Sequence, residues 1–464
     1  MRYISSRTGA EASGPETVFR GLAPDGGLYL PLFEPKPRGS LPPGLGDFAA
    51  AERWTLGELF PDFPAEVRED AVARFLSRFP AQDPVPLSKK GDFHFLELFH
   101  GPTGAFKDVA LSMLPVFMRH AAGGRRVLVL TATSGDTGSA AMQGFAGVDG
   151  TEIVVFYPAY GVSRVQRLQM TTPAEPNVHA VGIKGNFDDA QAAVKRMFAD
   201  PALAEAAAEK GVTLSSANSI NTGRLVPQIA YYISAASRLG GEFDCVVPSG
   251  NFGNILAAWY AKKLGAPIGK LVIASNVNDV LARFAKTGVY DPGEKFTVTN
   301  SPSMDIRRSS NVERLLWELN FDGDVERACK ATAGLMADLD SKGRYELSDS
   351  AKEGLFADFA SGSATEQETI AEMRRVLDEH GFAIDPHTAV ASFVARAMGL
   401  GKDVPCVVAA TATAHKFPET CRAAFGGDRL GPKPPAFERL ETMPEAQKEV
   451  CETAEMESVV RRLI

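Results

Sequence analysis

A single lysine, Lys107, stands between a turn rich in glycine and proline (residues 101–104) and an apolar repeat typical of a helix (residues 109–114). The positive end of a helix dipole disfavours a cation, and partial burial lowers the pKa of an amine further. Lys107 is therefore a candidate nucleophile that forms a Schiff base. The alternative is a lysine whose stem lies on apolar surface with its ammonium group in water.

Residues 243–265 are predicted to form a buried strand, a glycine-rich loop and a helix that ends at Gly265. Gly250 and Gly253 would let the backbone approach an anion, and the amides of residues 250–254 would point at it from the helix N-terminus. The loop lacks both the Gly-Lys-Ser/Thr of a P-loop and the G-x-G-x-x-G of a dinucleotide site. We predict a phosphate site here, and a tight turn without a ligand is the alternative.

Residues 126–147 repeat this strand, turn and helix, with hydroxyl groups and one carboxylate in the turn. The hydroxyl groups of Ser134, Thr137 and Ser139 can donate hydrogen bonds, together with loop amides, to the carboxylate of an amino acid. The alternative is that Ser134, Asp136 and Thr137 only cap the helix.

In combination, these motifs resemble the threonine synthase family, within the tryptophan synthase β-like, fold type II group of pyridoxal-phosphate enzymes. His-Gly-Pro-Thr-Gly-Ala-Phe-Lys-Asp at 100–108 resembles the cofactor-lysine motif of the family. Six further segments match in the family's order: 3–7, 22–31, 133–138, 218–224, 249–254 and 385–390. The N-terminal segments and Ser-Gly-Asp-Thr-Gly are similar to the longer, bacterial and fungal type.

The resemblance implies a reaction that uses pyridoxal 5′-phosphate. It converts O-phospho-L-homoserine and water into L-threonine and phosphate, the last step of threonine biosynthesis. Lys107 would hold the cofactor and move protons at Cα and Cβ of the substrate. Thr413 would form a hydrogen bond with the pyridine nitrogen. Asp136 would lie beside the 3′ oxygen of the cofactor, where a carboxylate needs a proton or a donor partner. The expected phosphate-binding residues are Gly250, Asn251, Phe252, Gly253 and Asn254.

The substrate implied by the resemblance carries its own phosphate, so a second anion site is required. The planar guanidinium group of Arg224 offers several N–H donors that could bind this second phosphate. A helix cap with a surface arginine is the alternative. The expected substrate-binding residues are Ser134, Gly135, Thr137, Asn218, Ser219, Asn221 and Arg224.

The chain departs from the family pattern in two places. Ser6-Arg7-Thr8-Gly9 stands where the family usually has Ser-Thr-Arg-Gly. The family's Thr-Ala-His-Pro-x-Lys-Phe is matched by Thr-Ala-His-Lys-Phe-Pro-Glu at 413–419, so we expect a shortened loop and assign no role to His415 or Lys416. At 385–388, Asp-Pro-His-Thr is interpreted as a helix start, with Asp385 as the cap.

Composition favours a soluble enzyme of two or three domains, because 45% of the 464 residues are hydrophobic and the net charge is −8. The charge and the absence of basic runs argue against nucleic-acid binding. The five cysteines and seven histidines show no metal-ligand spacing, so we expect no metal site. Without a signal pattern or an apolar run of about 18 residues, we expect a cytoplasmic protein, not bound to membranes, that is a monomer or homodimer.

The expected fold is α/β and fold type II: parallel sheets flanked by helices, with an extra N-terminal domain. The alternation of strand, loop and helix predicts this, and it gathers the glycine loops at one edge of a sheet. We expect an N-terminal domain at 1–90, with helices at 48–60 and 65–79. The catalytic region at 91–464 would hold two α/β subdomains and a helical insertion at about 310–400.

Three other functions are compatible with this scaffold, and the sequence disfavours two of them. A pyridoxal-phosphate phospho-lyase would release phosphate and 2-oxobutyrate from phosphohomoserine or phosphothreonine, and the motifs barely separate it from a synthase. A binding protein that only retains the fold is disfavoured by the intact Lys107 and phosphate loop. Serine or threonine dehydratase is disfavoured by the N-terminal segments and Ser-Gly-Asp-Thr-Gly.

Overall fold

The N-terminal residues form a small antiparallel sheet and three helices. In this computed structural model, which describes residues 1–426 and 429–464, β1 (Arg2–Ser5) lies between β2 (Glu11–Ala12) and β3 (Tyr29–Leu32). The helices are α1 (Gly14–Arg20), α2 (Phe48–Leu59) and α3 (Ala65–Arg78). The predictions of α2 and α3 are confirmed to within one residue, whereas the small sheet was not predicted.

A five-stranded parallel sheet, in the order β16-β8-β7-β6-β9, carries one set of loops. Its strands are β6 (Arg126–Ala132), β7 (Thr151–Pro158), β8 (Val178–Lys184), β9 (Val212–Ser216) and β16 (Val450–Glu452). Alternate side chains face opposite layers of helices, as the pleat requires. Val127 and Val129 belong to the main core, and Leu128 and Leu130 belong to a separate one on the other face.

Helices cover both faces of this sheet. The main core contains residues of α4 (Lys107–Ala122), α5 (Asp136–Phe145) and α6 (Arg164–Thr171). The other face packs against α7 (Phe187–Ala199), α8 (Pro201–Glu209) and α19 (Met456–Leu463), which follows the short turn η3 (Thr453–Glu455). The predicted alternation of strand and helix is confirmed here.

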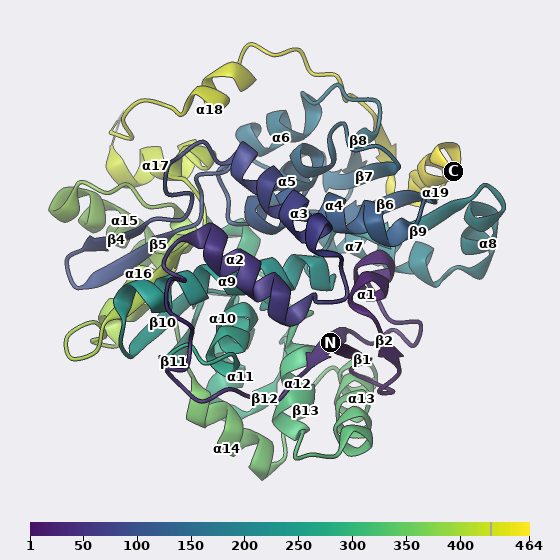
Figure 1. Cartoon of the computed structure of the whole chain (residues 1–464). Coiled ribbons are helices and arrows are strands. Elements are labelled where there is room, and N and C mark those ends of the chain that lie inside the picture. Colours follow the sequence, from purple (N-terminus) through teal and green to yellow (C-terminus); the bar gives the residue numbers. More distant parts are fainter. Residues whose placement is uncertain (427–428) are drawn as a thin grey trace.

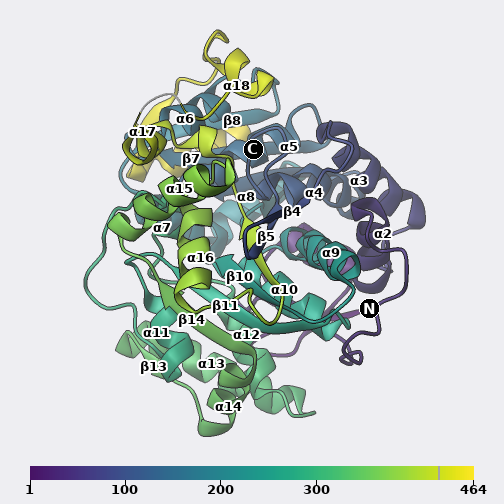
Figure 2. The ribbon, with the colours of Figure 1, turned by 90° about the vertical axis from the view of Figure 1, so that its left-hand side faces the viewer.

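The second sheet has six strands in the order β14-β11-β10-β15-β5-β4, and only the edge pair β4 and β5 is antiparallel. The strands are β4 (Leu87–Lys90), β5 (Phe93–Glu97), β10 (Phe243–Pro248), β11 (Ile268–Ser275), β14 (Phe359–Ser363) and β15 (Cys406–Ala410). Figure 2 shows α9 (Thr222–Leu239) and α10 (Gly253–Lys263) on one face, with α15 (Glu366–His380) and α16 (Pro386–Ala397) on the other.

The region expected to be a helical insertion at 310–400 also contributes strands. It holds α12 (Val312–Asn320), α13 (Val325–Lys342) and α14 (Asp349–Asp358), together with β13 (Tyr345–Glu346). β13 pairs with β12 (Val289–Tyr290), and β14 extends the six-stranded sheet beside β11. The region is mostly helical, as expected, but it is not helix alone, because β14 completes a sheet whose other strands lie elsewhere in the chain.

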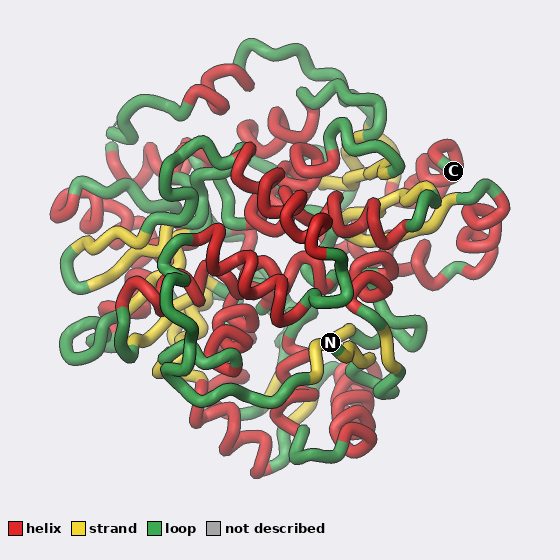
Figure 3. The backbone as a smooth tube through the Cα atoms, viewed as in Figure 1, coloured by secondary structure: helices red, strands yellow, loops and turns green. Residues whose placement is uncertain are grey.

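The N-terminal unit packs onto the catalytic region. α2 lies against α9 and α3 against α4 (Figure 1). Phe48 and Phe75 share one core with Phe117 and Tyr231. The small sheet lies beside α12 and α13 (Figure 3), where Ile4 joins a separate apolar cluster with residues of these helices. β4 belongs to the catalytic sheet although it lies within residues 1–90, so a boundary before β4 fits the sheet better than one at residue 90. The division of the chain into these two parts remains our proposal.

The remaining described elements are short. They are α11 (Val280–Thr287), η1 (Pro302–Met304), η2 (Ala414–Lys416), α17 (Pro418–Phe425) and α18 (Pro435–Leu440). No helix within the described residues has the length and apolar character needed to span a membrane.

Candidate active site

Loops from both sheets meet around one cavity of about 370 Å³. The turn after β6, the segment after β9, the loop after β10 and the start of α4 all contribute side chains to its wall. Parallel strands place such loops at their carboxyl ends, where ligands of α/β folds bind. The glycine loops were expected at one edge of a single sheet; they come instead from two different sheets and converge on this cavity.

Lys107 is the first residue of α4, as predicted, and its side chain lines the cavity. Gly104 forms the turn before it with φ of 69°, and a Cβ atom there would lie 2.6 Å from Cγ2 of Thr413. The amine lies 3.4 Å from Oδ2 of Asp136. Burial lowers the pKa of Lys107; Asp136 opposes this, whereas the charges of Arg224 and Lys416 lower it further. The structure therefore gives Lys107 the environment of a nucleophilic amine.

The predicted phosphate loop joins the end of β10 to the first turn of α10. Among the described non-glycine residues, only Phe252 has a positive φ, 64°, and this turns the chain into the helix. Ser309 donates a hydrogen bond to the carbonyl of Gly250, and the side chain of Asn311 donates one to the carbonyl of Asn251. The N-terminal amides of a helix lack partners within the helix, so the loop presents donors to an anion. All five predicted loop residues, 250–254, line the cavity.

Two tyrosines fix the orientation of the Asn254 side-chain amide. Its Oδ1 accepts hydrogen bonds from the hydroxyl groups of Tyr231 and Tyr232, at 2.7 and 2.6 Å. This orientation leaves Nδ2 buried and without a hydrogen-bond partner among the described residues. A buried donor of this kind is costly unless a ligand accepts from it.

Asp136 is surrounded by donors. Nζ of Lys416 lies 2.9 Å from Oδ1, Gln166 donates to Oδ1 at 2.9 Å, and Ser303 donates to Oδ2 at 3.2 Å. Burial alone would raise the pKa of Asp136, but Lys416, Lys107 and the other neighbours hold it well below its usual value. Donor partners, and not a proton, therefore satisfy this carboxylate.

The structure places Thr411, and not the predicted Thr413, in the cavity wall. β15 ends at Ala410, so Thr411 is the first residue beyond the strand. The amide of Thr413 instead donates to the carbonyl of Gly104 at 2.9 Å. The Thr-Ala repeat allows two alignments with the family motif. The one that starts at Thr411 reaches Lys416 and Phe417 without a gap. The expected shortening of this loop is therefore wrong: the loop has its full length, and the alignment that starts at Thr413 is displaced by two residues.

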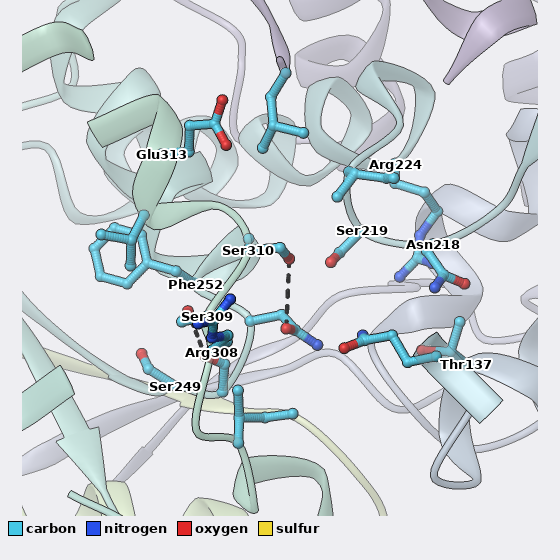
Figure 4. Close-up of a pocket in the computed structure, with 18 of the residues that line it drawn as sticks. Thr137, Asn218, Ser219, Arg224, Ser249, Phe252, Arg308, Ser309, Ser310 and Glu313 are labelled. Atoms are coloured by element: carbon cyan, nitrogen blue, oxygen red, sulfur yellow. Dashed lines mark hydrogen bonds between the residues drawn. The ribbon is translucent and has the colours of Figure 1, made fainter. Parts of the chain in front are cut away.

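Three of the residues predicted for a second anion site lie in the cavity wall. Arg224, Asn218 and Ser219 line the cavity, and Figure 4 shows Thr137 on the same side. Nη1 of Arg224 donates to the carbonyl of Ala217 at 2.7 Å, and Nε has no hydrogen-bond partner among the described residues. Burial lowers the pKa of Arg224 to about 10, so the guanidinium is still charged at neutral pH.

Two predicted substrate residues have structural roles instead. Asn221 is buried outside the cavity wall, where its Oδ1 caps α9 and its Nδ2 donates to the carbonyls of Val18 and Ser216. Gly135 also lies outside the wall. Its φ is 137°, and a Cβ atom there would lie 2.4 Å from Gln166.

Of the three hydroxyl groups expected to bind a carboxylate, two line the cavity. They belong to Ser134 and Thr137. The hydroxyl of Ser139 is buried and donates to the carbonyl of Gly135 at 2.9 Å, so it is not available to a ligand.

His387 lines the cavity, although its motif was interpreted only as a helix start. Asp385 does cap α16, as predicted, and its Oδ2 lies 2.6 Å from Nδ1 of His387. Nε2 accepts a hydrogen bond from the amide of Ser303. Nδ1 therefore carries the ring proton and donates a hydrogen bond to Asp385. The sequence signal that could have indicated this pair is the carboxylate of Asp385 two residues before the imidazole of His387.

Arg7, at the first departure from the family pattern, reaches the cavity from the N-terminal segment. It donates two hydrogen bonds of 2.9 Å to Glu313, which also accepts from Ser6. The N-terminal arm therefore forms part of the wall. Within the described part of the chain, no cluster of three or more potential metal ligands is present.

Comparisons with known proteins agree with one another. A family model described as "Pyridoxal-phosphate dependent enzyme" matches residues 86–338, and one described as "Threonine synthase, C-terminal" matches residues 388–464. The threonine synthase of Pseudomonas aeruginosa is 40% identical over 442 residues, which cover 91% of this chain and 90% of the relative.

Solved structures show the same relationship over the full length. The pyridoxal-phosphate-bound threonine synthase from Brucella melitensis superimposes with a TM-score of 0.89 at 38% identity, covering 100% of this chain and 99% of the other. The threonine synthase from yeast also gives 0.89, at 31% identity, with coverage of 100% and 98%.

Proposed function

The chain belongs to the threonine synthase family of pyridoxal-phosphate-dependent lyases, and we propose that it converts O-phospho-L-homoserine and water into L-threonine and phosphate. The observation that carries the proposal is the cavity itself. It combines the buried amine of Lys107 with a helix-terminal phosphate loop and a separate cationic group, Arg224. One phosphate site is needed for the cofactor and a second for this substrate.

The residues present fit pyridoxal 5′-phosphate. The amides of residues 250–254 and the unsatisfied Nδ2 of Asn254 would bind its phosphate, and Thr411 would donate to the ring nitrogen. A hydroxyl at this position does not force the nitrogen to be protonated, as a carboxylate would. When bound, the cofactor supplies the electron sink for negative charge at Cα of the substrate.

We assign the proton transfers to Lys107. Its amine would bond the aldehyde carbon of the cofactor, be released when the substrate amine takes its place, and then act as a base. It would take protons from Cα and Cβ of the substrate so that phosphate leaves from Cγ. Once phosphate has left, a proton returned to Cγ would make the methyl group of threonine. After water has added at Cβ, the same amine would return a proton to Cα. The lowered pKa of Lys107 suits these roles, since the neutral amine is the reactive form.

Arg224, Asn218 and Ser219 would bind the phosphate of the substrate. The guanidinium keeps an unused donor, Nε, in a buried position, where a hydrogen bond to phosphate is strong. Ser134, on the turn after β6, and Thr137, in the first turn of α5, would donate to the carboxylate of the substrate. Both groups of side chains line the same cavity as Lys107.

The test is an incubation of the cofactor-loaded protein with O-phospho-L-homoserine, with phosphate, threonine and 2-oxobutyrate assayed together. We expect equal amounts of phosphate and threonine from the wild type and neither from Lys107→Ala. Lys210→Ala, at an exposed position, is the matched control and should retain the activity. Phosphate with 2-oxobutyrate would instead identify a phospho-lyase. No phosphate at all would refute the substrate assignment.

A cytoplasmic location and a monomeric or homodimeric state remain parts of the proposal. The five cysteines are all free and buried, which suits a reducing compartment. Cell fractionation and sedimentation of the purified protein would test the two statements separately.

A further inference from the structure

A second lysine, Lys416, is buried beside Lys107, and the proposed chemistry leaves it without a role. It ends the short turn η2, and its side chain has no exposed surface. Its backbone carbonyl accepts a hydrogen bond from Ser163 at 3.1 Å, which ties η2 to the start of α6. Its amine lies 2.9 Å from Oδ1 of Asp136, whereas Lys107 lies 3.4 Å from Oδ2 of the same carboxylate.

Two lysines therefore compete for one buried carboxylate. A buried charge is stable only when it is paired, and a carboxylate that has lost one cation holds any other nearby cation more strongly. The shorter ion pair already gives Asp136 a full positive counter-charge. A second positive charge on Lys107 would leave a net charge of +1 in the buried site, with the charged Arg224 also nearby.

The other charged groups around the two amines do not remove this excess. Asp108, the carboxylate on α4, accepts hydrogen bonds from the amide and hydroxyl of Thr103 at 2.9 and 2.7 Å. Burial raises the pKa of Asp108, although the charge of Lys416 opposes this, so it is a weaker counter-ion than Asp136. His387 on α16 is paired with Asp385 through Nδ1. Asp136 is thus the one carboxylate found within ion-pair distance of Lys107 in the described chain.

We propose that Lys416 is a positioning residue: it neutralises Asp136 and so leaves Lys107 as the neutral amine that bonds the cofactor. Without the charge of Lys416, Asp136 would keep Lys107 protonated as its own counter-ion. The neutral fraction of Lys107 would then fall at any given pH. This inference rests on the proposed role of Lys107 as the cofactor-binding amine.

The experiment measures the titration of Lys107 directly. The full chain, freed of cofactor with hydroxylamine, is trace-labelled with acetic anhydride at a series of pH values, and acetylation of the Lys107 peptide is quantified by mass spectrometry. In Lys416→Met the midpoint should rise by about one pH unit or more, a tenfold loss of neutral amine at fixed pH below the midpoint. Lys416→Arg, which keeps the charge, should stay near the wild type.

A double variant separates the charge effect from structural damage. Asp136→Asn alone should lower the midpoint, because Lys416 is then an unpaired cation. Asp136→Asn combined with Lys416→Met removes both charges and should return the midpoint toward the wild type. An unshifted midpoint in Lys416→Met, or a double variant that matches Asp136→Asn, would overturn the inference. The second comparison decides the question even when Lys416→Met does not fold alone.

Borohydride reduction of the wild type with pyridoxal phosphate separates this inference from the proposed function. Absence of a reduced adduct on Lys107 would refute the cofactor role. The labelling experiment would still decide whether Lys416 controls the charge of Lys107, because it requires neither cofactor nor turnover.

Discussion

Replacing Thr411 by valine tests which of two threonines contacts the cofactor. Valine keeps the shape of the side chain and removes only the hydroxyl group. The backbone contacts of Thr411, to the hydroxyl of Thr388 and to the amide of Phe106, involve main-chain atoms and are retained. Thr413→Val is the matched control, since that residue lies outside the cavity wall, with its methyl group against Gly104.

The expected effect is that of a single hydrogen bond. A neutral hydrogen bond contributes about 0.5–1.5 kcal/mol, so loss of the hydroxyl should weaken cofactor binding roughly two- to tenfold. No cavity term is added, because the substitution preserves volume. Thr413→Val should change the affinity by less than about twofold, since no hydrogen bond to the cofactor is lost.

The affinity is measured by equilibrium dialysis of pyridoxal phosphate against the cofactor-free protein, with thermal unfolding as a control for folding. Weaker binding in Thr411→Val alone would support the alignment that starts at Thr411. Weaker binding in Thr413→Val, with Thr411→Val unchanged, would refute the reasoning from the cavity wall.

Two further predictions concern stability and the phosphate loop. Glu52 on α2 is buried, with both carboxylate oxygens unpartnered among the described residues, and burial raises its pKa well above the usual value. The wild type should therefore lose stability as the pH rises above about 4.3, the pKa of an unfolded glutamate. In urea unfolding, Glu52→Met should be more stable by about 1–3 kcal/mol at pH 8, and this gain should shrink toward pH 4; a gain independent of pH would contradict the argument. At Gly250, a Cβ atom would lie 2.5 Å from the carbonyl oxygen of Ser303, so Gly250→Ala should push the loops apart and weaken cofactor binding about tenfold. Gly334→Ala, where a Cβ atom meets nothing within 4 Å, should bind normally in the same dialysis assay, and equal affinities of the two variants would show that the loop tolerates the methyl group.

Much of the fold followed from local patterns. The start of α4 at Lys107 and the loop between β10 and α10 were located because turns and helix starts depend on residues close together in sequence. The N-terminal sheet and β14 were missed. β1 gains its partner β3 only across the intervening helix, and β14 is a strand only because β11 lies beside it.

Within the site, the sequence by itself indicated which loops and helix starts would supply residues of the cavity wall: Lys107, residues 250–254 and Arg224. Tertiary structure decided the pairings between distant segments. Lys416 meets Asp136, and Ser303 meets His387, only because the order of strands brings their loops to one cavity. It also decided between the two alignments of the Thr-Ala repeat, since the end of β15 selects which hydroxyl faces the cavity. Helix capping and glycine conformation depend on residues close together in sequence. The free energy of a buried charge depends instead on the groups that the fold places next to it.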